Sequence, residues 1–301
     1  MSKKFNKIVC IDKTNLEPWA LQQLQQYSTS GVEAYSDYPK DENEIIKRIG
    51  DAECIFVSWN TKITANIIRQ ANNLQYIGMC CSLIDKTSSN VDVIEAESHN
   101  IDVRGVKDYG DEGVVEYIFS ELIALAKGLK NVQWKAFPTE LKGKNLGVIG
   151  FGTLGTMVAN VATAFGMNVF YFSRTRKEEL ESEAIKYLPL PDLLSKSDVI
   201  TTHLPRNNRI LGENEFGRMK GNTILINTSL GPTYDIEAFK QWVSQNDNFA
   251  IVDEDGAEGY QQIYESYTNV LYSPIVAGMT DGAYFRLSQK VIQNVIEHLK
   301  D

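Results

Sequence analysis

Three glycines that follow a short apolar run have the spacing of a dinucleotide-binding turn. Residues 146–149 are apolar, as in a buried parallel strand, and Gly150, Gly152 and Gly155 then give the spacing G-x-G-x-x-G. In such a turn the first glycine permits a tight bend, the second lets the backbone approach a pyrophosphate, and the third lets the following helix lie close to its strand. The turn, with Thr153 and Leu154 at the helix start, predicts dinucleotide binding. The alternative is a glycine-rich turn without a ligand.

The segment after the next strand indicates which dinucleotide binds. An NAD site usually has Asp or Glu about 20 residues past the glycines, where it bonds the ribose 2′-hydroxyl. Here Ser173 follows the apolar run at residues 168–172, and Arg174, Thr175, Arg176 and Lys177 come next. A small hydroxyl with basic neighbours would hold a 2′-phosphate that a carboxylate would repel. The segment therefore favours NADP(H) over NAD(H), and the alternative is a solvated basic loop.

Composition limits the partners and the compartment. The formal net charge of −9 argues against nucleic acid and anionic membrane surfaces as main partners. No apolar run is long enough to span a bilayer, and the polar N-terminus lacks the apolar region of a signal peptide. Cys10, Cys54, Cys80 and Cys81 lack zinc-ligand spacing, so we expect no metal site and a reduced, cytoplasmic protein.

Strand-like runs alternate with helical patterns along the chain, which predicts parallel sheets built from βαβ units. A length of 301 residues suggests two domains. We expect one domain from residues 1–104 together with the final helix, residues 282–301, and a dinucleotide-binding domain from residues 105–281. A helix from residue 114 to about residue 127 would connect them.

Further motifs occur in a fixed order after the first domain. They are Val115-Glu116, Glu140–Gly147 before the glycine turn, Thr202-His203-Leu204-Pro205, Asn227-Thr228-Ser229, Val252-Asp253 with Glu258, and Ser273-Pro274 with Ala277-Gly278 and Thr280. Together with the glycine turn, they resemble the motifs of the D-isomer-specific 2-hydroxyacid dehydrogenase family over nearly the whole chain. The resemblance implies a Rossmann dinucleotide-binding domain, a smaller flavodoxin-like substrate domain and a homodimer formed through the cofactor domains. It adds to the expected cofactor contacts His203, Leu204, Pro205, Thr228, Ser229, Asp253, Ala277 and Gly278.

The sequence departs from the family at the residues that perform the reaction. The family transfers hydride between a nicotinamide and a 2-hydroxy or 2-keto acid, with an Arg that grips the carboxylate, a His that moves the proton and a Glu that orients the His. Leu230 stands at the Arg position and Ile275 at the His position, while Glu258 remains. The family's substrate loop is also altered and reads Cys80, Cys81, Ser82 and Leu83. Loss of the cation and the proton donor should cost several powers of ten in rate on ordinary 2-keto acids.

Two functions remain open. The first is an oxidoreductase that acts on a small molecule without the usual carboxylate and uses Tyr109 or Glu258 in catalysis. The alternatives are a surface tyrosine and a carboxylate on a solvated turn. A thiol of Cys80 or Cys81 is a further candidate for the acid, and the alternative is that both cysteines only pack in the core. Asp108, Asp111 and Glu112 are also candidates, but we expect them to cap the connecting helix and to complement its dipole. The second function is a non-catalytic NADP(H)-binding sensor or interaction protein.

Overall fold

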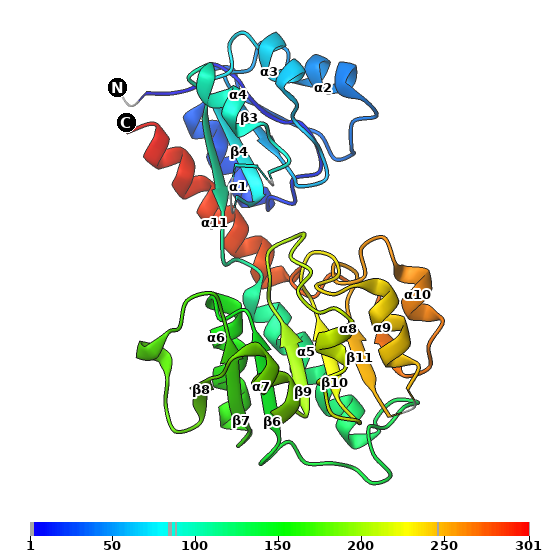
Figure 1. Ribbon diagram of the computed structural model, residues 1–301. Coiled ribbons are helices and arrows are strands. Elements are labelled where there is room, and N and C mark those ends of the chain that lie inside the picture. Colours follow the sequence, from blue (N-terminus) through cyan, green and yellow to red (C-terminus); the bar gives the residue numbers. More distant parts are fainter. Residues whose placement is uncertain (1–2, 84–85, 88, 246, 301) are drawn as a thin grey trace. The chain divides into compact units, whose positions relative to one another are not determined.

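The chain forms two compact α/β units, each built around a parallel sheet (Figure 1). The computed structural model describes residues 3–83, 86–87, 89–245 and 247–300. The first unit consists of Met1–Tyr109 and Asp281–Asp301, and the second of Gly110–Thr280. The predicted fold class, with two parallel-sheet domains of unequal size, is confirmed. Residues 105–109, assigned to the second domain from the sequence, belong to the first unit, because strand β5 extends as far as Val106.

The first unit has a five-stranded sheet in the order β2-β1-β3-β4-β5. All of its described strand pairs are parallel. Its strands are β1 Ile8–Cys10, β2 Val32–Ala34, β3 Cys54–Val57, β4 Tyr76–Ser82 and β5 Asp102–Val106. Its helices are α1 Pro18–Leu24, the 3-10 turn Gln25–Tyr27, α2 Glu42–Ile49, α3 Ala65–Gln70, α4 Val93–Ser98 and α11 Asp281–His298.

Alternation along these strands supplies apolar side chains to two cores. Ile8 and Cys10 belong to a cluster that includes Leu287 and Val291 of α11. Val9 lies between them in sequence and belongs to the other cluster, with side chains of α2, α3 and α4. Because successive side chains of a strand point to opposite faces, both faces of the sheet are covered. The final helix therefore completes the first unit, although it lies far from it in sequence.

The second unit has a seven-stranded sheet in the order β12-β11-β10-β9-β6-β7-β8. Its strands are β6 Asn145–Ile149, β7 Asn168–Phe172, β8 Ile185–Tyr187, β9 Val199–Thr202, β10 Ile224–Asn227, β11 Phe249–Val252 and β12 Val270–Tyr272. Its helices are α5 Asp111–Lys127, α6 Thr153–Ala164, the 3-10 turn Glu178–Leu180, α7 Leu190–Lys196, α8 Glu213–Phe216, α9 Ile236–Val243 and α10 Gln261–Glu265. The edge strand β8 was not predicted, because three residues with one buried side chain carry almost no periodic signal.

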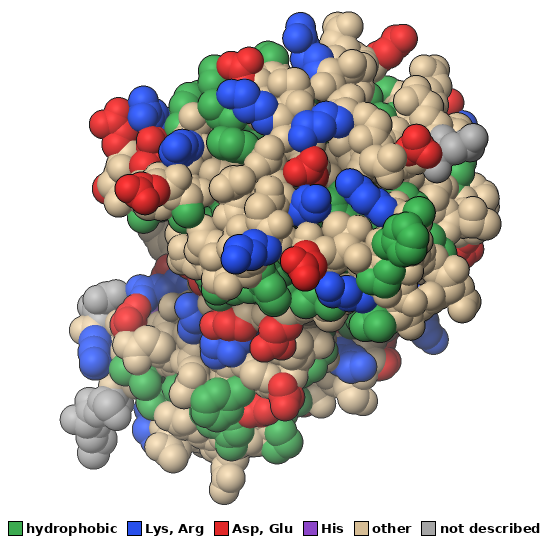
Figure 2. All heavy atoms as spheres, turned by 90° about the horizontal axis from the view of Figure 1, so that it is seen from below, with side chains coloured by type: hydrophobic (Ala, Val, Ile, Leu, Met, Phe, Trp, Pro, Cys, Tyr) green, Lys and Arg blue, Asp and Glu red, His purple; other side chains and the backbone are tan. Residues whose placement is uncertain are grey.

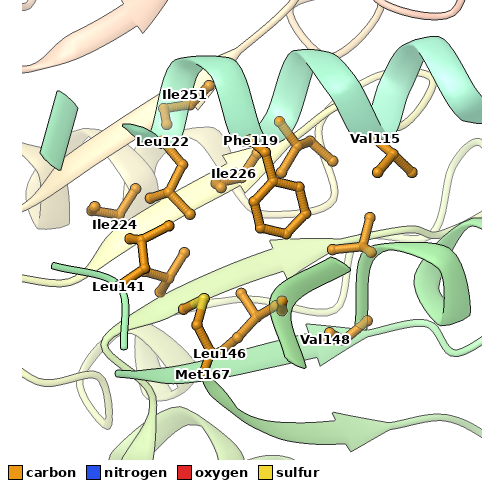
Figure 3. Packing of buried hydrophobic residues seen from close by; sticks show 14 of the residues in the cluster. Val115, Phe119, Leu122, Leu141, Leu146, Val148, Met167, Ile224, Ile226 and Ile251 are labelled. Atoms are coloured by element: carbon orange, nitrogen blue, oxygen red, sulfur yellow. The ribbon is translucent and has the colours of Figure 1, made fainter. Parts of the chain in front are cut away.

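Helix α5 covers one face of this sheet. In Figure 3, Val115, Phe119 and Leu122 of α5 lie over apolar side chains of the strands, among them Val148 of β6 and Ile226 of β10. Burial of each such side chain contributes about 2 kcal/mol relative to exposure. The helix thus belongs to the core of the second unit rather than serving only as a connector.

The start of α5 differs from the prediction in one respect. The helix begins three residues earlier than expected, with Gly110 as its N-cap and without a side-chain capping bond. Asp111 and Glu112 lie in its first turn, where their charges complement the positive end of the helix dipole. Their predicted electrostatic role is thus supported by the geometry, and the N-cap position itself is occupied by Gly110.

The segment expected to form a substrate loop in the first unit is mostly a strand. Cys80, Cys81 and Ser82 are the last three residues of β4, and Leu83 follows the strand. Both cysteine side chains are buried. Burial raises the pKa of the Cys81 thiol to about 12, so the thiolate is scarce at neutral pH. The prediction of a loop is therefore wrong for Cys80–Ser82, and packing accounts for the two cysteines.

The surface carries mixed charge. On the face seen in Figure 2, acidic and basic side chains are interspersed with hydrophobic ones rather than gathered by sign. None of the helices in the described residues is both long and apolar enough to cross a membrane.

Candidate functional site

A cavity of about 430 Å³ lies at the carboxyl ends of β6, β7 and β9 in the second unit. The strand order changes direction between β6 and β9, and ligands of open α/β sheets bind at such a switch point. The residues that line the cavity are Gly150, Phe151, Gly152, Phe172, Ser173, Arg174, Thr175, Lys177, His203, Leu204, Pro205, Asn208 and Ile210. The structure thus brings together eight predicted cofactor residues from three separate segments, and adds four that were not singled out: Phe151, Phe172, Asn208 and Ile210.

The three glycines of the turn have different surroundings. Gly150 has φ +95°, and a Cβ there would lie 2.1 Å from the carbonyl oxygen of His203. A Cβ on Gly155 would lie 2.2 Å from the carbonyl oxygen of Gly150. A Cβ on Gly152, in contrast, would meet nothing within 4 Å. Two glycines are therefore required by the fold itself, whereas Gly152 leaves open space beside the cavity, as the approach of a pyrophosphate requires.

Helix α6 starts at this open space. Its N-cap is Gly152, which provides no side-chain capping bond, so the first backbone N–H groups of the helix are available to an anion. Thr153 is exposed, and the side chain of Leu154 packs against the core below. Leu154 would therefore reach a ligand through its backbone rather than its side chain.

The basic residues after β7 do not all face the cavity. Arg174 and Lys177 line it. Arg176 does not: its Nε lies 2.6 Å from Oε1 of Glu181, and its guanidinium lies over the ring of Tyr187. The local sequence does not distinguish the three cations, because the partner that holds Arg176 lies beyond the segment.

Polar atoms without partners lie at the ends of β9 and β10. Within the described residues, Nδ1 of His203 and Oγ1 of Thr228 are buried and make no hydrogen bond. Buried polar atoms are normally paired, so these two fit contacts with a bound polar ligand. Burial lowers the pKa of His203 to about 3, which keeps its ring neutral at physiological pH. Together with the space at Gly152, these atoms fit a dinucleotide.

Other expected cofactor residues connect the loops of this edge. The Ser229 hydroxyl donates to the Thr202 carbonyl and accepts from the Leu204 N–H. The Asp253 carboxylate accepts from the Gly256 N–H at 2.8 Å and from the Ala277 N–H at 2.9 Å. The segment with Ala277 and Gly278 also lies against the start of α5. These bonds hold the ends of β9 to β12 in one arrangement.

Arg206 is a site residue that sequence analysis missed. It lies after β9, and its Nη1 lies 2.5 Å from both carboxylate oxygens of Glu258, which follows β11. The Glu258 carboxylate also lies 3.4 Å from the position that a Cβ on Gly231 would take. Arg206 is therefore the observed partner of Glu258. Only the position of Arg206 directly after Leu204-Pro205, in the loop after β9, could have pointed to the pair.

Aliphatic side chains occupy the two altered positions. Leu230 is partly buried after β10, next to Gly231. Ile275 is 56% exposed after β12, and its carbonyl accepts from the Glu254 N–H at 3.0 Å. The backbone of Ile275 is thus fixed in this loop, while its side chain is exposed.

Asp255 lies in the loop after β11, near Glu258 in sequence. Its carbonyl accepts from the Gly231 N–H at 2.9 Å and from the Glu258 N–H at 3.3 Å. Burial, and then the charge of Asp253, raise the pKa of its carboxyl to about 7, while Arg206 opposes the rise. The group therefore exchanges its proton near neutral pH, as a general acid or base must.

Tyr109 belongs to the first unit. Its ring packs against the apolar cluster of β1, β3, β4 and α11, and its carbonyl accepts from Nε of Arg286 at 2.8 Å. The ring thus has a packing role in the first unit, and a catalytic role for its hydroxyl stays a prediction. Among the residues that the structure describes, no group of three or more His, Cys, Asp and Glu side chains could hold a metal ion.

The family model "D-isomer specific 2-hydroxyacid dehydrogenase, NAD binding domain" matches residues 117–268. The glyoxylate reductase of Aeropyrum pernix is 27% identical to the chain over 308 residues, 93% of this chain and 89% of the relative. The hydroxypyruvate reductase of Blautia hydrogenotrophica is 29% identical over 253 residues, 75% of each protein.

Two solved structures match nearly the full length. An acyclic imino acid reductase in complex with NADPH and D-Arg has a TM-score of 0.82 at 27% identity, and the match covers 98% of this chain and 97% of that one. The D-lactate dehydrogenase of Aquifex aeolicus complexed with NAD and lactic acid has a TM-score of 0.78 at 25% identity, with 98% and 96% covered.

Proposed function

The chain belongs to the D-isomer specific 2-hydroxyacid dehydrogenase family, and from that premise we propose that it is an NADP(H)-dependent reductase of carbonyl compounds that lack the usual carboxylate. The observation that carries the proposal is a contrast within the second unit. A cavity with an open glycine turn and basic residues lies at one part of the carboxyl edge. At the other part, Leu230 and Ile275 replace the family's cation and proton donor.

We call the part of the second unit around Leu230 and Ile275 the reaction edge. Its charge supports a substrate without a carboxylate. Glu254, Asp255 and Glu258 gather there around Arg206, and the positive charge of Arg206 is already paired with Glu258. An anionic keto acid would meet net negative charge, which disfavours its binding by several kcal/mol at close range. A neutral or cationic carbonyl or imine compound would meet no such repulsion.

The preference for NADP(H) is supported by the residues after β7. A 2′-phosphate would lie near Arg174, Lys177 and the hydroxyl of Ser173, with no carboxylate among the cavity residues to repel it. A relative of this fold that is 27% identical is known in complex with NADPH. The cofactor residues of the proposal are therefore the cavity residues together with Thr153, Leu154, Gly155 and Thr228.

The proposal includes assembly and compartment. Leu129 and Phe137 in the segment after α5 are 71% and 81% exposed, and burial of such side chains would favour a homodimer through the second unit. All four cysteines are free and buried, which suits the reducing cytoplasm.

Cofactor titration and a substrate panel test the proposal. Purified protein would be titrated with NADPH and NADH under anaerobic conditions, and then mixed with stoichiometric NADPH and keto acids, aldehydes, ketones and imines. We expect tighter binding of NADPH and stereospecific oxidation of the cofactor by a substrate without a carboxylate. Equal affinity for the two cofactors contradicts the cofactor preference, and fast reduction of glyoxylate contradicts the altered substrate.

A second candidate function follows from the paired substitution. Joint replacement of the cation and the proton donor by Leu230 and Ile275 suits a protein that binds NADP(H) without turnover, as a sensor or interaction module. The same experiment separates the candidates, because micromolar NADPH affinity without oxidation by any compound of the panel favours the second.

A further inference from the structure

A reductase needs a proton donor for the substrate oxygen, and few described groups at the reaction edge qualify. His203 stays neutral because burial lowers its pKa to about 3. The Tyr272 hydroxyl donates to Glu254, and burial raises its pKa to about 12. The Glu258 carboxylate is paired with Nη1 of Arg206 at 2.5 Å, so an ion pair already occupies it. Asp253 is almost fully buried, and its carboxylate already accepts from the N–H groups of Gly256 and Ala277. Asp255 is less buried, and burial raises the pKa of its carboxyl to about 7, so that it can exchange a proton near neutral pH.

The backbone places Asp255 beside the altered positions. Its carbonyl accepts from the N–H of Gly231, the residue directly after Leu230. The Asp253 carboxylate closes the same turn by accepting from Gly256, and it also holds Ala277, two residues after Ile275. The turn is thus fixed to both loops from which the family's Arg and His have been lost. Asp255 is only partly buried, so that part of the residue is open to solvent.

We propose that Asp255 delivers the proton to the substrate oxygen, and that the Arg206–Glu258 ion pair positions and tunes it. The proposal rests on the proposed function. The substrate carbon accepts a hydride from reduced nicotinamide, the C=O π electrons move to the oxygen, and the oxygen takes the Asp255 proton. The products are the alcohol, oxidised nicotinamide and an Asp255 carboxylate, which regains its proton from water.

The charges that face Asp255 make the tuning testable. Asp253, Glu254 and Glu258 of its own turn disfavour the carboxylate, and Arg206 from the loop after β9 favours it. The loop after β10 contributes the Gly231 N–H, to the carbonyl rather than to the carboxyl. Removal of Arg206 should therefore raise the pKa of Asp255, and neutralisation of Glu258 should lower it.

The first experiment follows the reaction of the full chain between pH 5 and 9, with NADPH and the best carbonyl substrate of the panel. Because the acid must be protonated, kcat/KM of wild type should fall above about pH 7. Asp255→Asn should lose about 100-fold in kcat/KM and should lose the pH-dependent fall, with NADPH affinity unchanged by fluorescence titration. Asp255→Glu should restore part of the rate. Glu237→Gln on α9, where an exposed carboxylate pairs with Lys240, is the control and should change nothing.

The second experiment measures the carboxyl group itself. The ¹³C carboxyl signal of Asp255, assigned by its absence in Asp255→Asn, should titrate near pH 7 in wild type, higher in Arg206→Gln and lower in Glu258→Gln. The fall in kcat/KM should move in the same directions. Folding is not expected to confound Asp255→Asn, because ionisation of a carboxyl with a raised pKa weakens the fold as pH rises through about 7. The variant should thus have a Tm at pH 8 at least equal to that of wild type.

The outcomes separate this proposal from the proposed function. Turnover by wild type with full activity in Asp255→Asn, or an Asp255 signal that titrates near pH 4, overturns the assignment of Asp255 and leaves the reductase standing. Absence of turnover by wild type over the whole panel overturns both.

Discussion

The carboxyl ends of the strands in the second unit form two parts, and each part is built from a different kind of atom. The part around β6 and β7 is defined mainly by backbone: a bend at Gly150, an open position at Gly152 and the free end of α6. The part around β10 to β12 depends on side-chain ends, among them those of Leu230, Ile275, Arg206 and Asp255. A backbone cradle is required by the fold and resists change, whereas side-chain ends at loop positions can be exchanged without loss of the fold. One scaffold can therefore keep its cofactor while its chemistry changes.

The strongest test of this difference compares two glycines of the turn. Gly150→Ala places a Cβ at positive φ and 2.1 Å from the His203 carbonyl. The variant should lose on the order of 3 kcal/mol of unfolding free energy and bind NADPH at least about 100-fold more weakly. Gly152→Ala meets nothing within 4 Å, so we expect a Tm near that of wild type and weaker NADPH binding alone. Denaturant unfolding and fluorescence titration measure both quantities. Unchanged affinity in Gly152→Ala would show that no pyrophosphate approaches this position.

Restoration of the family residues tests the reaction part. Leu230→Arg combined with Ile275→His should raise kcat/KM on glyoxylate or pyruvate by about 100-fold or more, since it returns a polarising cation and a proton donor. The initial rate of NADPH oxidation measures the effect, and each single variant is a control that should gain much less. A double variant that binds NADPH as wild type does but gains no activity would indicate that other residues exclude keto acids.

A smaller effect is expected at the basic segment after β7. Arg174→Ala should weaken NADPH binding about tenfold and leave NADH binding unchanged, because one charge-assisted contact with a phosphate is lost. Arg176 is the matched control: its guanidinium is held by Glu181 outside the cavity, so that Arg176→Ala should change the NADPH affinity less than twofold. If both variants have the same effect, the segment acts as a diffuse positive charge.

No change at all is expected from thiol reagents. Cys81 has a pKa raised to about 12, and burial likewise raises the pKa of Cys80. The native protein should therefore not react with a disulfide reagent at pH 7.5 and should keep its NADPH affinity, whereas the unfolded chain should react at all four cysteines. Rapid reaction of one thiol in the native state, accompanied by loss of turnover, would return Cys80 or Cys81 to the list of catalytic candidates.

Much of the fold could be read from the sequence, because its signals are local. Apolar runs at residues 54–57 and 199–202 form the strands β3 and β9 with the expected bounds. The apolar pattern did not predict an element that is very short, or a strand end that depends on pairing with a neighbouring strand. β8 consists of three residues, and β4 continues through Cys80–Ser82 because Ser82 pairs with Val106 of β5 after a register shift. Pairing with a distant strand leaves no trace in the local pattern.

The sequence by itself determined the two α/β domains, the glycine turn and the aliphatic character of Leu230 and Ile275, since each depends on the period of apolar residues or on residue identity. Only the tertiary structure decided which charged groups meet. Arg206 and Glu258 are 52 positions apart, and Arg176 is held by Glu181 while Arg174 is not. The physical reason is that strand order brings loops together from separate parts of the chain, and the charge of a side chain such as Asp255 then depends on burial and on neighbours that no local pattern specifies.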